Sequence, residues 1–133
     1  MTKNIKLSSL RNDRYEDPNG EWKDSAIYPG VSWLVRSNLF PDYQTARDIE
    51  MQRLSKSYGD TPIPGKAISK ALGPVIADNL LLGWKGLDVE YSREQAREIL
   101  GDFGYRRVLD DVERCAMRVG EKNLEFVEDL AKN

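Results

Sequence analysis

Histidine is absent from this chain of 133 residues. Its absence removes the commonest general base, the commonest metal ligand and the side chain that titrates near physiological pH. The spacings typical of zinc sites, calcium loops and glycine-rich phosphate loops are missing too. Asp102-Phe103-Gly104 matches a kinase tripeptide, but the other kinase motifs are lacking, so we assign it to a helix end. We therefore expect no catalytic residue, no metal and no cofactor, and the chain is not expected to be an enzyme.

Cysteine occurs once, as Cys115. A single cysteine excludes an internal disulfide framework and suits a reducing compartment. Because Cys115 lies on the apolar stripe of a predicted helix, we expect its thiol to be buried and inert. Long hydrophobic runs are also missing, since Asp78 and Asn79 interrupt the stretch from Val75 to Leu82. With no signal-peptide pattern, the sequence predicts a soluble cytosolic protein that does not enter membranes.

The chain also lacks an excess of charge of one sign. The 20 basic and 22 acidic residues are mixed along the chain and give a net charge of −2. This balance offers no electrostatic reason to bind nucleic acid. One cluster of acids and arginines, three or four residues apart, is expected to form a solvent-exposed ion-pair face. Its members are Asp110, Asp111, Glu113, Arg106, Arg107 and Arg114.

The residues that are present predict one domain, 1–133, in three parts. Residues 1–20 are polar and are expected to form a flexible arm, with Leu7 and Leu10 able to dock on the body. Residues 21–36 predict a β-hairpin, because Tyr28-Pro29-Gly30-Val31 suits a type II turn and the residues after it alternate in polarity. Residues 41–133 are expected to form a helical body.

Four stretches of the body predict helices. One runs from Pro41 to Tyr58, and a second from Lys66 to Trp84, where Gly73-Pro74 must kink it or start another helix. Ser92 to Gln95 is a capping box that opens a third. The fourth begins near Tyr105, and its stripe continues past Gly120 through Phe126, Val127 and Leu130.

The predicted fold is therefore mainly α, a small domain of three to five helices with an N-terminal β-hairpin. Its expected core consists of apolar residues at helical spacing. They are Ile49, Leu54, Val75, Ile76, Leu80, Ile99, Leu100, Val108, Leu109 and Val112.

Two surfaces are candidates for binding other proteins. The first is the stretch 84–91, where an extended backbone would place Leu87, Val89 and Tyr91 on one face and Asp88 and Glu90 on the other. That face is either sealed against the domain or offered to a partner, and its candidate residues are Trp84, Leu87, Val89 and Tyr91. The second is the hairpin, which carries more apolar surface than two strands can bury and packs either on its own helices or on another subunit. Its candidate self-association residues are Trp22, Ile27, Trp33 and Val35.

In the order of its parts the chain resembles the tail assembly chaperones of long-tailed (siphovirus-type) bacteriophages and prophages. The resemblance extends from about Leu7 to Asn133 and rests mainly on YPGVSWLVR (28–36), LLLGWKGLDVEYSREQAREIL (80–100) and the closing AKN. The connection from Gly59 to Gly65, with two prolines, departs from the family pattern.

The resemblance implies a chaperone that binds the tape measure protein in the host bacterial cytoplasm and is absent from the mature virion. It also implies that a longer form, made by ribosomal frameshifting, recruits tail tube protein. A small helical adaptor, or another phage morphogenesis protein of the connector type, is the alternative. A small DNA-binding regulator, with a helix-turn-helix within 92–119, is a third hypothesis, which the acids of the last helix disfavour.

Overall fold

The computed structural model describes residues 3–128, which form four α-helices, two short 3-10 helices and five strands. In chain order they are β1 (Lys3–Ile5), η1 (Leu7–Leu10), β2 (Glu21–Asp24), β3 (Ser32–Val35), α1 (Pro41–Tyr58), α2 (Gly65–Asn79), β4 (Leu81–Lys85), α3 (Arg93–Gly101), η2 (Phe103–Tyr105), α4 (Arg106–Met117) and β5 (Phe126–Glu128). The number of helices agrees with the prediction. Because the strands form two separate sheets, the fold is mixed α/β rather than plainly mainly α.

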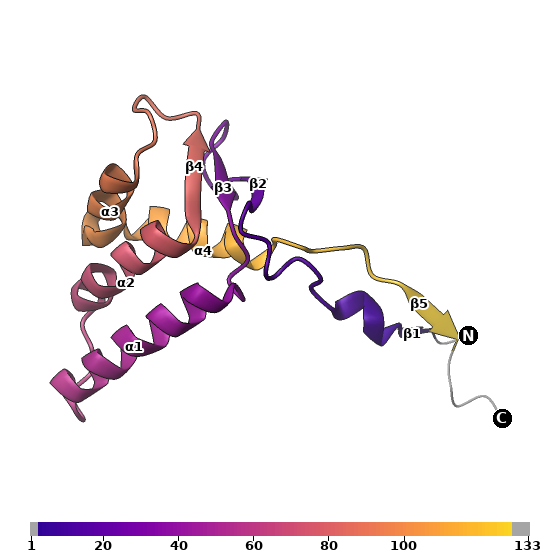
Figure 1. Cartoon of the computed structure of the whole chain (residues 1–133), viewed down its shortest axis with the longest axis horizontal. Helices are drawn as coiled ribbons and strands as arrows, with labels where there is room; N and C mark the ends of the chain where they lie inside the picture. Colours follow the sequence, from indigo (N-terminus) through magenta and orange to yellow (C-terminus); the bar gives the residue numbers. More distant parts are fainter. Residues whose placement is uncertain (1–2, 129–133) are drawn as a thin grey trace.

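The larger sheet has the order β2-β3-β4 and is antiparallel throughout (Figure 1). Its first two strands confirm the predicted hairpin. The turn between them is held by a hydrogen bond of 3.1 Å from the Val31 amide to the Tyr28 carbonyl. Gly30 has a φ of 85°, which the third position of a type II turn requires. The turn residues alone therefore predicted this part of the fold.

The third strand corrects the prediction of a helix from Lys66 to Trp84. The helix α2 ends at Asn79, whose side-chain amide donates to the Val75 carbonyl, and the chain then pairs with β3 as β4. Short apolar runs have no periodicity that distinguishes a buried strand from a buried helix turn. Pro74 lies inside the single helix α2 and does not start a second one.

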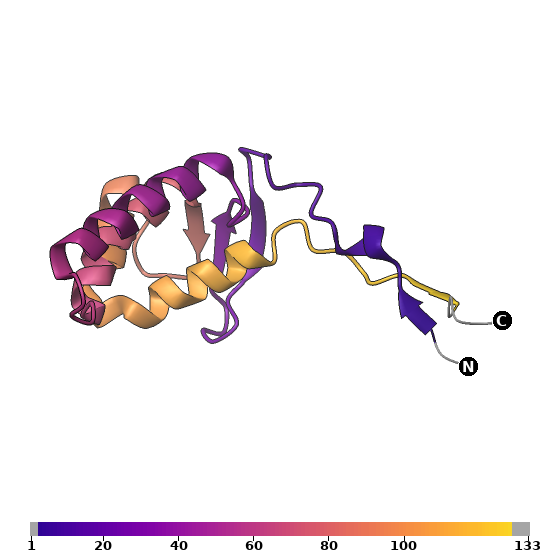
Figure 2. The same cartoon turned by 90° about the horizontal axis from the view of Figure 1, so that it is seen from below.

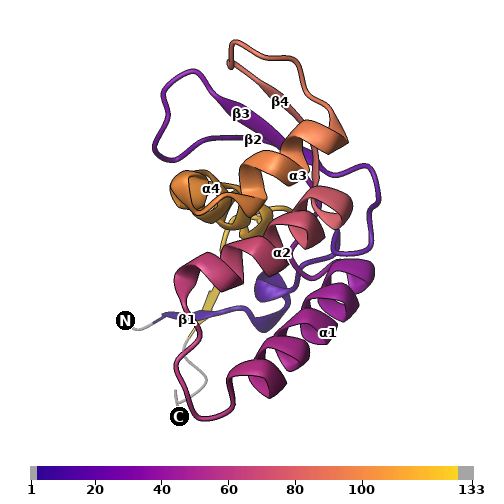
Figure 3. The ribbon, with the colours of Figure 1, turned by 90° about the vertical axis from the view of Figure 1, so that its left-hand side faces the viewer.

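The helices α2 and α4 pack against this sheet, and α2 lies between α1 and α3 (Figure 3). The crossing of α2 and α3 is close because Gly73 faces the backbone of Leu100 and Gly101. A side-chain carbon at Gly73 would collide with that backbone. The third helix begins as predicted, since the Ser92 hydroxyl accepts a hydrogen bond of 3.1 Å from the Gln95 amide.

The core lies between the sheet and the helices. Most of the expected core residues are buried, and Ile99 and Val108 are partly buried against the others. The prediction for Ile49 was wrong, because this side chain is 60% exposed. The helix α1 turns its Tyr43 and Leu54 face inward, and Ile49 lies about 240° around the helix from Tyr43.

The last helix is shorter than predicted. It ends at Met117, and Gly120 then adopts a φ of 79°, which a continuing α-helix cannot accommodate. Phe126 and Val127 are exposed in the strand β5 and not in a helix, while Leu130 and the closing residues 131–133 lie outside the described residues.

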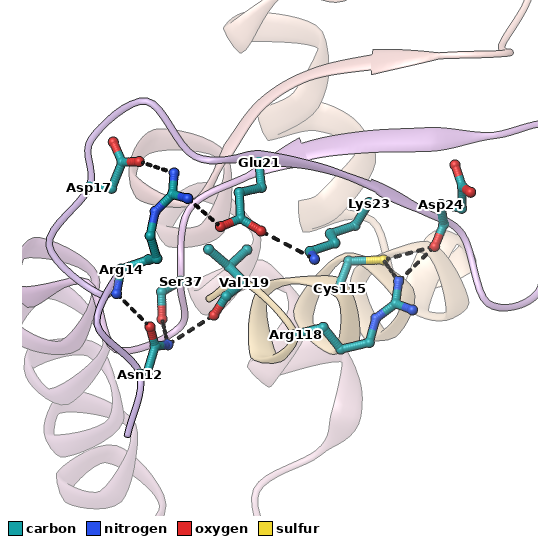
Figure 4. A network of polar contacts seen from close by, with 10 residues as sticks. All are labelled: Asn12, Arg14, Asp17, Glu21, Lys23, Asp24, Ser37, Cys115, Arg118 and Val119. Atoms are coloured by element: carbon teal, nitrogen blue, oxygen red, sulfur yellow. Dashed lines mark hydrogen bonds and ion pairs between the residues drawn. The ribbon is translucent and has the colours of Figure 1, made fainter. Parts of the chain in front are cut away.

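The two ends of the described chain pair with each other as β1 and β5, well away from the body (Figures 1 and 2). Figure 4 shows how the chain before and within β2 is fastened to the body. The Asn12 side-chain amide donates to the Val119 carbonyl at 2.9 Å and to the Ser37 hydroxyl at 3.2 Å. We call residues 3–11, which lie beyond this anchor, the arm tip. Its Leu7 is exposed and does not dock on the body, whereas the partly exposed Leu10 lines a cavity with Met117 and Val119 of the body.

Candidate functional site

The candidate site begins where β4 leaves the sheet. Gly86 has a φ of 90° and lies so close to the Gly30 carbonyl that no side chain fits between them. Bends then follow from Gly86 to Val89 before the chain reaches the cap of α3. This segment therefore leaves the sheet beside the hairpin turn and crosses toward α3.

Two aromatic side chains hold the segment in place. The Trp84 ring lies edge-on to Trp33, with centroids 6.3 Å apart, and to Tyr91, with centroids 5.1 Å apart. Its indole N–H donates to the Val89 carbonyl at 2.8 Å, while the Tyr91 hydroxyl donates to the Leu81 carbonyl at 3.1 Å. Burial raises the pKa of Tyr91. Trp84 is only 8% exposed. It therefore stabilises the segment through packing and exposes little side-chain surface to a partner.

The four predicted binding residues do not form one exposed face. Leu87 and Val89 are 40% and 37% exposed and line an open cleft, and Asp88 lines the same cleft. The expected alternation of apolar and acidic residues fails because the segment bends instead of running as a strand. Tyr91 packs on Trp84 outside the cleft lining.

The cleft has a volume of about 660 Å³ and is formed by the 87–89 segment, α3, the start of α4 and the inner face of the sheet. Its lining is mostly apolar and aromatic. The lining residues are Tyr28, Val31, Trp33, Leu81, Trp84, Leu87, Asp88, Val89, Gln95, Glu98, Ile99, Leu100, Asp102, Tyr105 and Val108. Leu100 and Trp33 form its closed floor, and the exposed Leu87 and Tyr105 stand at its opening.

All charged residues of the lining are acidic: Asp88, Glu98 and Asp102. None of the lysines and arginines in residues 3–128 lines it. Asp102 accepts a hydrogen bond from the Gly104 amide at 2.9 Å, which confirms that this tripeptide is a helix end. Asp88 and Glu98 form no hydrogen bond or ion pair with any described side chain. We call this site the acidic cleft, since it combines an apolar lining with uncompensated negative charge.

The hairpin residues predicted to mediate self-association divide into two pairs. Trp33 and Val35 are 1% and 0% exposed and pack in the core of their own subunit. Trp22 and Ile27 remain exposed, and the Lys85 ammonium lies 4.0 Å from the Trp22 ring centre. Of the four side chains, only Trp22 and Ile27 are accessible to a second subunit.

Sequence reasoning placed Asp111 on an exposed ion-pair face, and this was wrong. Asp111 is 2% exposed and accepts hydrogen bonds from the Trp33 indole at 2.7 Å and the Ser25 hydroxyl at 2.6 Å. Asp110, by contrast, pairs with Arg106 in solvent as expected. The sequence spacing could have indicated that Asp111 is buried, because Asp111 lies four residues before Cys115 and therefore on the same buried face of α4.

Cys115 is fully buried, as predicted, and burial raises the pKa of its thiol. Within residues 3–128 there is no group of three acidic or cysteine side chains placed to hold a metal ion. Across the same residues, every helix is too short or too polar to traverse a lipid bilayer.

Comparison with known proteins adds no relative: no family model, no curated protein and no solved structure shows a significant match to this chain.

Proposed function

We propose that this protein is a tail assembly chaperone of a long-tailed bacteriophage, which binds the tape measure protein and keeps it soluble while the tail tube assembles. The observation that carries the proposal is the acidic cleft, because the segment 80–100, on which the sequence resemblance mainly rests, supplies most of its lining. In this proposal the protein works in the host cytoplasm, is absent from the mature virion, and has a longer frameshifted form that recruits tail tube protein.

The chemistry of the cleft suits such a client. A long amphipathic helix exposes an apolar stripe and aggregates unless other proteins cover that stripe. The lining offers apolar contacts, and the unpaired Asp88 and Glu98 favour stripes flanked by lysine or arginine. Weak contacts repeated by many copies along one client give high combined avidity and still permit release.

Co-expression with the tape measure protein tests the proposal. The variant Leu87→Ser/Val89→Ser removes two exposed cleft residues, so we expect it to fold normally by circular dichroism but to leave the client insoluble. Ile49→Ser/Leu39→Ser is the matched control, because it removes two exposed apolar side chains outside the cleft and should solubilise the client fully. A wild-type protein that neither co-purifies with nor solubilises the client would refute the function. A folded cleft variant that works normally would refute only the site.

A further inference from the structure

The arm tip presents a small apolar knob. Leu7 and Leu10 begin and end the 3-10 helix η1, and residues three apart in such a helix lie one above the other. Leu7 is 80% exposed and Leu10 is 58% exposed, and Leu10 lies beside Met117 and Val119 of the body. Ser9, in the same turn, is buried, and its hydroxyl donates to the Lys6 carbonyl at 2.7 Å, which holds the turn.

The knob is flanked by positive charge. The arm tip contains Lys3, Lys6 and Arg11 and no acidic residue. Lys6 pairs with Glu125 at 3.6 Å and Arg11 with Asp13 at 2.9 Å, and all four side chains are more than half exposed. Ion pairs this exposed contribute little free energy and exchange readily for others. The arm tip is therefore an apolar and basic element that the pairing of β1 with β5 holds in its own chain, while the side chains of Leu7, Lys6 and Arg11 stay more than half exposed.

The acidic cleft has the complementary character. It is apolar inside, carries three acids and no base, and leaves the Asp88 and Glu98 carboxylates unpaired. Its volume of about 660 Å³ leaves ample room for two leucine side chains. Docking of the knob would place Lys6 and Arg11 near these acids, where attraction between opposite charges fixes the orientation.

The arm tip cannot reach the cleft of its own molecule. The strand β1 and the helix η1 project from one end of the body, whereas α3 and the 87–89 segment lie at the other (Figure 1). From this placement and the charge complementarity we infer that the arm tip of one copy docks in the acidic cleft of a second copy. Two different surfaces meet in such a contact, so copies join head to tail. This is a property of the free protein and goes beyond the proposed function, because it requires no client.

Sedimentation velocity of the full chain tests the contact. For the wild type we expect a sedimentation coefficient that rises with protein concentration. Leu7→Ser/Leu10→Ser removes the knob, and Asp88→Lys/Glu98→Lys reverses the charge of the cleft. All four side chains are exposed, so both variants should keep the wild-type circular dichroism spectrum. Each variant alone should associate at least about tenfold more weakly than the wild type.

Mixing the variants separates head-to-tail docking from other modes of association. The knob variant keeps an intact cleft, and the cleft variant keeps an intact arm tip. Equal amounts of the two should therefore form a 1:1 heterodimer that grows no further. Contacts that join the same surface of two copies, such as pairing of the outer edge of β1 with the outer edge of β1 in a second copy, would not be restored in this way.

Three results would overturn the inference. The first is a wild type that remains monomeric at every accessible concentration. The second is a knob variant that associates as strongly as the wild type. The third is a mixture of the two variants that stays monomeric. A charge-reversal pair adds specificity, because Lys6→Glu/Arg11→Glu should associate with Asp88→Lys/Glu98→Lys but not with the wild-type cleft.

Discussion

The Asp111 carboxylate joins α4 to β3 and to the loop that precedes it. One oxygen accepts from the Ser25 hydroxyl and the Trp33 indole, and the other accepts from the Ala26 amide at 3.1 Å. Because the carboxylate is buried, each of these bonds is shielded from water. This acid therefore positions Trp33, which forms part of the floor of the acidic cleft.

Asp111→Ala is expected to lower the free energy of unfolding by about 3 kcal/mol, because it leaves the buried indole N–H of Trp33 without an acceptor. Urea denaturation monitored by tryptophan fluorescence measures the loss. Asp110→Ala is the control at the adjacent position. Its ion pair with Arg106 is exposed, so the expected loss is below about 0.5 kcal/mol. Equal losses for the two variants would contradict the buried hydrogen bonds of Asp111.

Glu113 introduces a dependence of stability on pH. Burial raises the pKa of Glu113, and the nearby Asp110 adds to this effect. Its carboxylate accepts from the Tyr43 hydroxyl at 3.4 Å, and burial together with this carboxylate raises the pKa of Tyr43 to about 12. The folded state therefore holds the Glu113 proton more tightly than the unfolded state does. The stabilising contribution of protonated Glu113 is fully present below its unfolded-state pKa of 4.5, and it is lost as the pH rises through the higher pKa of the folded state.

Glu113→Gln removes this titration and keeps an oxygen for the Tyr43 hydroxyl. We expect the variant to be more stable than the wild type near pH 7 and the difference to shrink toward about pH 4. Urea midpoints measured across this range provide the test. Glu16→Gln, which removes one exposed carboxylate, is the control for the loss of a negative charge. If Glu113→Gln were less stable than the wild type near pH 7, Glu113 would not be penalised by burial.

At the scale of elements, the crossing of α2 and α3 determines the position of the cleft wall. Gly73 allows α2 to approach the backbone of Leu100 and Gly101 at the end of α3. The helix α3 in turn supplies Gln95, Glu98 and Ile99 to the lining. A change in the distance between these helices therefore changes the width of the cleft.

Gly73→Ala is expected to cost about 2 kcal/mol, because the added carbon meets backbone that cannot move aside locally. Gly101→Ala is the matched control, since its added carbon meets only the Pro74 side chain at an ordinary 3.9 Å. Thermal melting followed by circular dichroism compares the two. Equal melting temperatures for Gly73→Ala and the wild type would show that the helices are not in close contact.

At the scale of the whole molecule, β1 and β5 lie at one end and the acidic cleft at the other (Figure 1). If the arm tip of one copy occupies the cleft of the next, a client must displace it. Self-association and client binding then share one surface and exclude each other.

Under the proposed function, we therefore expect an apolar, lysine-rich helical segment of the tape measure protein to dissolve wild-type assemblies. The sedimentation coefficient should fall to that of a single copy with bound peptide as the peptide is titrated. A peptide of the same composition in scrambled order, without the apolar stripe, is the control and should leave the assemblies intact. Peptide bound to assemblies of unchanged size would show that the arm tip and the client use different surfaces.

Several local features of this protein are determined by the sequence alone, without any tertiary contact. The Pro29-Gly30 turn, the cap at Ser92 and the burial of Cys115 all follow from residues within one turn or one helix. Such features depend on backbone preferences and on side-chain spacing along a few residues. The sequence also named Leu87 and Val89 as candidate binding residues, and both line the acidic cleft.

Only the tertiary structure decided the remaining features, because they depend on residues far apart in the chain. Leu81 to Lys85 is a strand because β3 offers an open edge, and β1 exists through pairing with residues more than 120 positions away. Asp111 is buried because Trp33 and Ser25 supply donors from another element. The cleft itself arises where the 87–89 segment bends toward α3 and α4. The free energy of each feature comes from contacts between distant segments, which spacing along the chain does not specify.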